Sequence, residues 1–154
     1  MKTIEGDLVE LGKSGRFDVI VHGCNCQNEM GAGIARIIAK EFPEAEKADK
    51  ATEKGDRDKL GTITHATVEC EGHDLTVVNA YTQFDYRGRG KKVDVDAVKS
   101  AFEAIAKEFP DARVGYPLIG AGMAGGDWDE IAPIIDAALE GQDHALVVLP
   151  DKKG

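Results

Sequence analysis

Two glycine-rich loops contain the residues whose types and spacing could do chemistry. The first, residues 22–33, follows an apolar run and precedes a helical pattern over 34–42. The second, residues 120–127, also follows an apolar run and precedes a helical pattern over 128–139. Free backbone N–H groups and the positive end of a helix gather where a strand leads into a helix, and both attract phosphate. Two such loops predict a diphosphate held between them.

His22 and Asp127 are the side chains beside these loops that could move protons. A histidine titrates near neutral pH and can act as a general acid or base, and a carboxylate can position water. Each residue also has a structural alternative. His22 could be a hydrogen-bonded core residue at the end of a buried strand, and Asp127 could be a helix N-cap. The sequence leaves both alternatives open.

A metal site near the first loop is not expected. His22, Cys24 and Cys26 alternate, so they share one face of a strand. Structural zinc usually takes four ligands, with wider cysteine spacing. The remaining candidates, Cys70, His65, His73 and His144, are scattered along the chain. We therefore expect small buried thiols and no metal, and the odd count of three cysteines does not suggest a disulfide framework.

Composition narrows the class of protein. The chain has 154 residues, which favours a single domain over 1–154, and its 42% hydrophobic content is ordinary for a globular protein. The net charge of −9 argues against general nucleic-acid binding. No apolar run approaches the roughly 20 residues of a membrane span. No signal-peptide pattern opens the chain, so we expect a cytoplasmic protein without a membrane partner.

Strand and helix patterns alternate along the chain. Strands are predicted over 2–4, 18–23, 61–69, 74–81, 113–119 and 145–149, and helices over 32–42, 44–54, 93–109 and 128–139. This alternation predicts an α/β fold, a three-layer α/β/α sandwich with a central mixed sheet. Ligands of such sheets bind beyond the carboxyl ends of the strands, where both glycine loops would open. The basic loop 84–92 could contact a terminal phosphate or be solvated surface.

The ordered motifs resemble a macrodomain, the ADP-ribose-binding module, over nearly the whole chain. They are Gly6-Asp7-Leu8, Cys24-Asn25-Cys26, residues 30–35, Phe42-Pro43-Glu44-Ala45, Leu60-Gly61 and residues 117–122. The segments 22–26 and 125–128 resemble the branch of ADP-ribose 1''-phosphate phosphatases found in yeast and phages. The resemblance implies the macrodomain fold.

The resemblance also implies a set of ligand contacts. Asp7 would accept a hydrogen bond from the adenine amino group beside the Leu8 backbone, and Asn25 would lie near the distal ribose. The diphosphate would lie between Met30, Gly31, Ala32, Gly33 and Ile34 on one side and Gly120, Ala121, Gly122, Met123, Ala124 and Gly125 on the other. Asp7 and Asn25 have a plain alternative as turn residues.

These implications predict an enzyme that binds ADP-ribose and hydrolyses ADP-ribose 1''-phosphate without metal or cofactor, with His22 and Asp127 as catalytic residues. The alternatives are a non-catalytic ADP-ribose-binding module and a hydrolase of O-acetyl-ADP-ribose or of ADP-ribosylated macromolecules. Gln83 and Ala124 stand where related glycohydrolases carry a lysine and an aspartate, which disfavours a lysine-dependent reaction. A nicotinamide-dependent dehydrogenase fits poorly, because the first loop lacks G-x-G-x-x-G.

Overall fold

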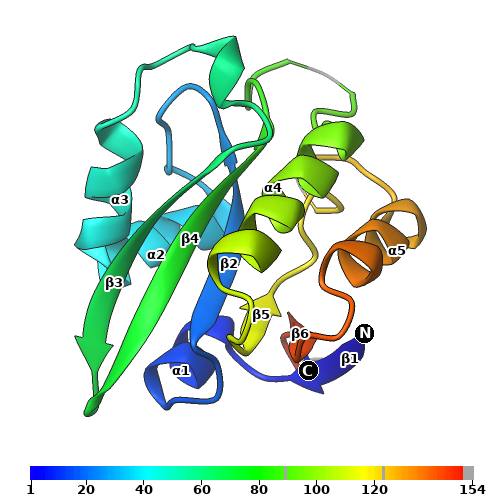
Figure 1. Cartoon of the computed structure of the whole chain (residues 1–154). Coiled ribbons are helices and arrows are strands. Elements are labelled where there is room, and N and C mark those ends of the chain that lie inside the picture. Colours follow the sequence, from blue (N-terminus) through cyan, green and yellow to red (C-terminus); the bar gives the residue numbers. More distant parts are fainter. Residues whose placement is uncertain (89, 123, 151–154) are drawn as a thin grey trace.

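Six strands form one mixed sheet in the order β1-β6-β5-β2-β4-β3 (Figure 1). The strands are β1 (Lys2–Glu5), β2 (Val19–Asn25), β3 (Ile63–Cys70), β4 (His73–Gln83), β5 (Val114–Tyr116) and β6 (His144–Val148). All neighbouring pairs are parallel except β3 with β4. The computed structural model describes residues 1–88, 90–122 and 124–150, so Met123 and residues 151–154 of the predictions lie outside the described residues.

Helices cover both faces of the sheet (Figure 1). They are α1 (Leu8–Lys13), α2 (Gly33–Glu41), α3 (Pro43–Lys50), the 3₁₀ helix η1 (Arg57–Lys59), α4 (Val95–Glu108) and α5 (Trp128–Ala138). Helices α4 and α5 pack on one face, while α1, α2 and α3 pack on the other. The predicted three-layer α/β sandwich with a mixed sheet is confirmed.

The central strand β2 shows how alternation builds the two cores. Val19 and Val21 belong to the apolar cluster beneath α4 and α5, while Ile20 belongs to the cluster beneath α1 to α3. Successive side chains of a strand point to opposite faces, so a strand covered on both sides reads as a continuous apolar run. By the same alternation, His22 lies on the Ile20 face.

Two elements were not expected from the sequence, and one strand is shorter than predicted. Helix α1 has six residues and η1 has three, too few for a helical period to show. Strand β5 ends at Tyr116 rather than continuing to residue 119. The residue that follows is Pro117, which has no N–H to continue the ladder, and its carbonyl instead accepts a turn hydrogen bond from Ile119. Within the described ranges, no helix is long and apolar enough to cross a membrane.

Candidate functional site

The carboxyl ends of the five parallel strands lie along one edge of the sheet. The segments that follow β1, β2, β4 and β5 therefore meet there, and they include both predicted glycine loops. This edge is where an α/β sheet of this kind binds ligands.

The N-terminus of α2 is open. Its N-cap residue, Ala32, makes no side-chain capping bond, and the first turn contains no acidic residue. The segment 31–33 is exposed, and nothing would lie within 4 Å of a Cβ added at Gly31. Among the described residues, no hydrogen-bond partner is found for the backbone N–H groups of Gly31 and Ala32. Free N–H groups and the positive end of the helix dipole at this point suit a phosphate. Ile34 is half-buried and Met30 is a core residue, so Met30 can offer a ligand only its backbone.

The N-terminus of α5 is closed by its own cap. Asp127 Oδ1 accepts a hydrogen bond from the backbone N–H of Asp129 at 2.9 Å, so the predicted N-cap alternative is confirmed. A carboxylate at this position occupies the positive end of the helix and would repel a phosphate there. The second loop can therefore contact a phosphate directly only through backbone groups ahead of Asp127. Asp127 is exposed, and the bond engages only Oδ1.

The second glycine loop is folded back on itself. Gly126 N–H donates to the Gly120 carbonyl at 2.6 Å, and the Ala124 carbonyl accepts from the N–H of Lys92 at 2.7 Å and from that of Val93 at 3.2 Å. Gly120 has a φ of +74°, and a Cβ there would lie 2.5 Å from Val93 Cγ2. The N–H groups of the predicted contacts Ala121 and Gly125 are also used inside the loop, by the carbonyls of Leu118 and Gly122. Among the described residues of this loop, the exposed backbone of Gly122 is what remains for a ligand.

Asp7 caps α1 while remaining exposed at the edge. Its Oδ1 accepts a hydrogen bond from Glu10 N–H at 3.1 Å. Its second carboxylate oxygen has no hydrogen bond within the described part of the chain, so Asp7 can cap the helix and accept from a ligand at once. The Leu8 side chain is buried in the core, which leaves only its backbone beside Asp7.

Asn25 closes the first loop. Its Oδ1 accepts from the backbone N–H of Gln27 at 3.0 Å and of Glu29 at 3.4 Å, and its Nδ2 donates to the Glu29 carbonyl at 2.9 Å. This is the turn role that the sequence also allowed. Asn25 as a whole residue is 6% exposed, and its predicted contact with a ribose stays a prediction.

A buried lysine, which the sequence analysis did not predict, donates hydrogen bonds to the same loop. Lys59 is 8% exposed, and its Nζ donates to Asn28 Oδ1 at 2.5 Å and to Thr52 Oγ1 at 2.9 Å. Asn28 adopts a φ of +58° and also donates from Nδ2 to the Thr52 carbonyl at 2.9 Å. The N–H of Gly55 bonds the Cys26 carbonyl at 2.7 Å. Residues 52–59 thus clamp the first loop.

His22 lies inside the protein. Its ring has no exposed surface, and Nε2 is 2.6 Å from Asn79 Oδ1. Asn79 donates from Nδ2 to the Ala45 carbonyl and to Thr64 Oγ1, so its Oδ1 must accept and His22 Nε2 carries the proton. Burial lowers the pKa of His22 to about 4, so the ring is neutral at physiological pH. A ring without exposed surface touches no ligand in this conformation, and the core alternative describes its position.

A second buried polar group lies near His22, beneath the first loop. Tyr81 donates from its hydroxyl to Asp49 Oδ1 at 2.8 Å, while Asp49 Oδ2 has no hydrogen-bond partner among the residues that the structure describes. Burial raises the pKa of the Asp49 carboxyl and also that of the Cys24 thiol. Cys24 and Cys26 pack with Tyr81 in one small cluster, as the expected buried thiols. No three His, Cys, Asp or Glu among the described residues are arranged to hold a metal ion.

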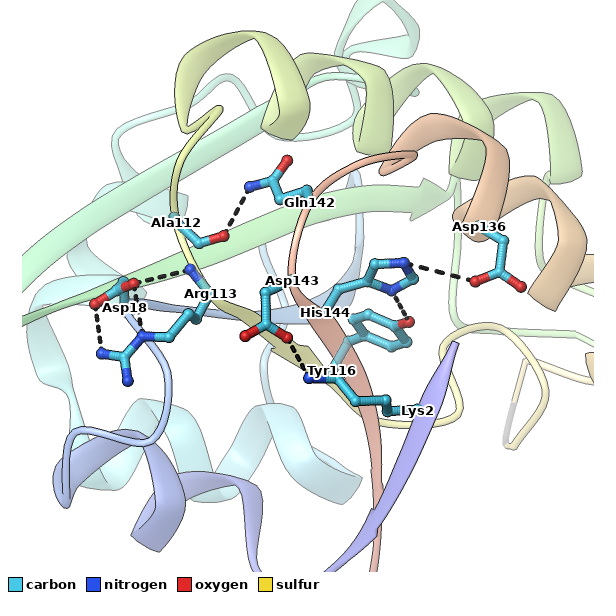
Figure 2. Close-up of polar contacts among 9 residues, drawn as sticks. All are labelled: Lys2, Asp18, Ala112, Arg113, Tyr116, Asp136, Gln142, Asp143 and His144. Carbon is cyan, nitrogen blue, oxygen red and sulfur yellow. Dashed lines mark hydrogen bonds and ion pairs between the residues drawn. The ribbon is translucent and has the colours of Figure 1, made fainter.

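The polar contacts drawn in Figure 2 lie mainly at the opposite edge of the sheet. Arg113 and Asp18, which precede β5 and β2, pair at 2.9 Å, and His144 begins β6 (Figure 2). His144 Nδ1 is 2.6 Å from the Tyr116 hydroxyl, and its Nε2 is 3.6 Å from Asp136. Of these contacts, His144 with Asp136 joins the amino end of β6 to α5, and none lies at the edge that carries the glycine loops.

Comparison with known proteins places this geometry in a family. Residues 21–135 match the Macro domain family model. The chain is 36% identical over 142 residues to an uncharacterized 17.5 kDa protein from the tk-vs intergenic region of Enterobacteria phage T4, covering 88% of each chain. It is 26% identical over 141 residues to the DNA ADP-ribosyl glycohydrolase of Mycobacterium tuberculosis, covering 89% of this chain and only 39% of that protein. It is 21% identical over 159 residues to the ADP-ribose 1''-phosphate phosphatase of Lodderomyces elongisporus, covering 97% and 98%.

Solved structures agree on the fold. The macrodomain of Thermus aquaticus DarG superposes with a TM-score of 0.73 at 21% identity, covering 97% of both chains. Thermosipho africanus DarTG in complex with ADP-ribose superposes with a TM-score of 0.73 at 18% identity, covering 97% of this chain and 41% of that one.

Proposed function

This chain belongs to the macro domain family, and we propose that it binds ADP-ribose along the carboxyl edge of its sheet. The observation that carries the proposal is the open N-terminus of α2, with its exposed segment 31–33 and no acidic residue in the first turn. In a protein of net charge −9, such a backbone site can hold a diphosphate without a cluster of basic side chains.

The strand order gives the ligand a direction. Asp7 follows β1 at one end of the sheet, while the glycine loops follow β5 and β2 in the middle. The free oxygen of Asp7 would accept from the adenine amino group, and the diphosphate would lie at Gly31 to Ile34 with the turn around Gly122 opposite. The solved complex of Thermosipho africanus DarTG with ADP-ribose supports this ligand class.

The binding proposal is tested by Asp7→Asn. Asparagine caps helices as well as aspartate does, so α1 keeps its N-cap. With the amide oxygen used as the cap, only the NH₂ group would face the adenine amino group. We expect the affinity for ADP-ribose to fall about tenfold in isothermal titration calorimetry, with an unchanged melting temperature. Equal affinities of the two proteins would refute the role of Asp7. Wild type that binds no ADP-ribose would refute the proposed function.

We further propose that the bound compound is ADP-ribose 1''-phosphate and that the protein hydrolyses it to ADP-ribose and phosphate without a metal. The similarity to the Lodderomyces elongisporus phosphatase supports this reaction. The exposed second oxygen of Asp127 is the available carboxylate for positioning water. His22 is fully buried, so it would act by holding β2 and β4 together beneath the ligand edge through its bond to Asn79, and not by touching substrate. The similarity to the mycobacterial glycohydrolase keeps hydrolysis of an ADP-ribosylated macromolecule as the second candidate.

Phosphate release in the presence of a chelator tests the reaction. Asp127→Asn keeps the N-cap and removes the charge, so loss of phosphate release with normal thermal stability would place the carboxylate in the chemistry. Asp127→Asn with full activity would leave Asp127 as a cap only. Wild type that binds ADP-ribose but releases no phosphate would exclude the phosphatase and leave a binding module or the second candidate.

A further inference from the structure

The far end of the ligand lies against the loop that follows β4, if the proposed binding mode holds. The sheet order places β1 at one end and β4 beyond β2, next to the edge strand β3. A ligand with adenine at Asp7 and its diphosphate at α2 must run its distal ribose toward β4. Strands are about 4.8 Å apart, so β4 lies about 10 Å beyond β5 along the edge. Phe84 is the first residue after β4.

Phe84 is fastened to the first glycine loop. Its carbonyl accepts the backbone N–H of Cys26 at 3.0 Å and Gln27 Nε2 at 3.1 Å. Its ring packs against the cluster of Cys24, Cys26 and Tyr81. Phe84 is therefore a fixed part of the wall next to the end of β2.

The guanidinium of Arg57 lies over this ring. Its Cζ is 3.9 Å from the centroid of Phe84, close to the contact distance of two stacked planes. η1, which carries Arg57, is joined to the same wall through the bond from Gly55 N–H to the Cys26 carbonyl. In Figure 1 the turn between α3 and β3 lies beside the segment that joins β4 to α4. A stacked guanidinium keeps its N–H groups in its own plane, so their edge stays open to solvent.

Two neighbouring cations among the described residues are paired with carboxylates. Arg87 binds both oxygens of Asp85, at 3.0 and 2.8 Å. Lys91 pairs with Glu130 at 3.3 Å. Arg57 is exposed, and within the described part of the chain it has no ion pair. Of these three cations, Arg57 is the one at the distal end that is both held in place and free to take an anion.

We propose that Arg57 binds a phosphate group attached to the distal ribose, and that it sets the preference for ADP-ribose 1''-phosphate over ADP-ribose. Guanidinium pairs with phosphate through two parallel N–H···O bonds, which fixes both position and charge. Arg57 is thus a specificity-determining residue, and the basic loop 84–92 mainly supplies the ring on which it stacks. This proposal rests on the proposed function, because the direction of the ligand comes from Asp7.

The test compares the affinities of two ligands for matched variants. Each ligand displaces a fluorescent ADP-ribose analogue within seconds of mixing, and a phosphate assay confirms that ADP-ribose 1''-phosphate is still intact. Arg57→Met keeps an apolar chain over Phe84 but removes the donors, and Arg57→Lys keeps the charge without the planar fork. Arg87→Met removes an equal charge from the neighbouring loop and serves as the control.

We expect wild type to prefer ADP-ribose 1''-phosphate by about tenfold or more. Arg57→Met should abolish that preference with unchanged ADP-ribose affinity, Arg57→Lys should keep part of it, and Arg87→Met should keep all of it. Equal weakening of both ligands by Arg57→Met would show a merely structural role and overturn the proposal. No preference in wild type, or the same loss in Arg87→Met, would also overturn it. Wild type that binds neither ligand would overturn the proposed function, and this proposal with it.

Discussion

The buried position of His22 predicts a specific sensitivity to acid. In the folded chain burial lowers the pKa of the ring to about 4, and the hydrogen bond from Nε2 to Asn79 only partly opposes this shift. In the unfolded chain the same ring takes up a proton below its ordinary pKa of 6.5. Below pH 6.5 the unfolded state therefore binds more protons than the folded state. The free energy of unfolding should fall as the pH falls from about 6.5 to about 4, and this contribution should change no further below that.

These two pKa values give the size of the effect. Lowering the pH from 7.5 to 5 protonates nearly all of the unfolded histidine and about a tenth of the folded one, which costs about 2 kcal/mol. Burial lowers the pKa of His144 too, so wild type loses further stability through that residue. The variant His22→Gln keeps a side-chain donor for Asn79 and cannot titrate. The difference between the two pH dependences therefore isolates His22.

Urea unfolding at the two pH values measures this difference. Wild type should lose about 2 kcal/mol more than His22→Gln between pH 7.5 and pH 5. Equal losses in the two proteins would mean that His22 titrates normally while folded. The buried neutral ring would then be refuted, and a catalytic role for His22 at the ligand edge would regain its basis.

Two substitutions test the packing beneath and beside the ligand loops. Lys59→Met removes the ammonium from Asn28 and should cost about 3 kcal/mol and about 6–12 °C in melting temperature, with weaker ADP-ribose binding. The exposed control Lys47→Met should stay within about 0.5 kcal/mol, and an equally small change in Lys59→Met would contradict the clamp. Gly120→Ala needs a φ of +74° and brings a Cβ to 2.5 Å from Val93, so thermal unfolding should show a loss of about 2–4 kcal/mol. A neutral Gly120→Ala would mean that the second loop is not packed as described.

Strands and helices with strong periodic patterns could be predicted because their signals are local. Strand β2 reads as a continuous apolar run, and it is covered by helices on both faces. The helix predicted over 93–109 appears as α4, Val95–Glu108, with Asp94 as its N-cap. Helix α1 escaped prediction because six residues cannot show a period. The predicted end of β5 was wrong, because the turn at Pro117 stops the ladder three residues after β5 begins.

The parts of the candidate site that would bind a ligand through backbone groups could be predicted from the sequence. Glycine spacing placed both loops at the carboxyl edge of the sheet, since a strand followed by a helix puts the intervening loop there. The sequence allowed Asp127 to be either a cap or a catalytic group, and the structure shows the cap. It allowed His22 to be either a core or a catalytic residue, and the structure shows a buried ring.

The sequence by itself determined the order of the long elements and the two glycine loops, because each depends on residues only a few positions apart. The tertiary structure alone decided which polar side chains are buried and which stay exposed. His22 meets Asn79 across 57 positions of the chain, Lys59 meets Asn28 across 31, and Arg57 stacks on Phe84 from a different element. Burial and pairing set the protonation state of each group and its access to a ligand. Burial and pairing arise only when distant segments are packed together.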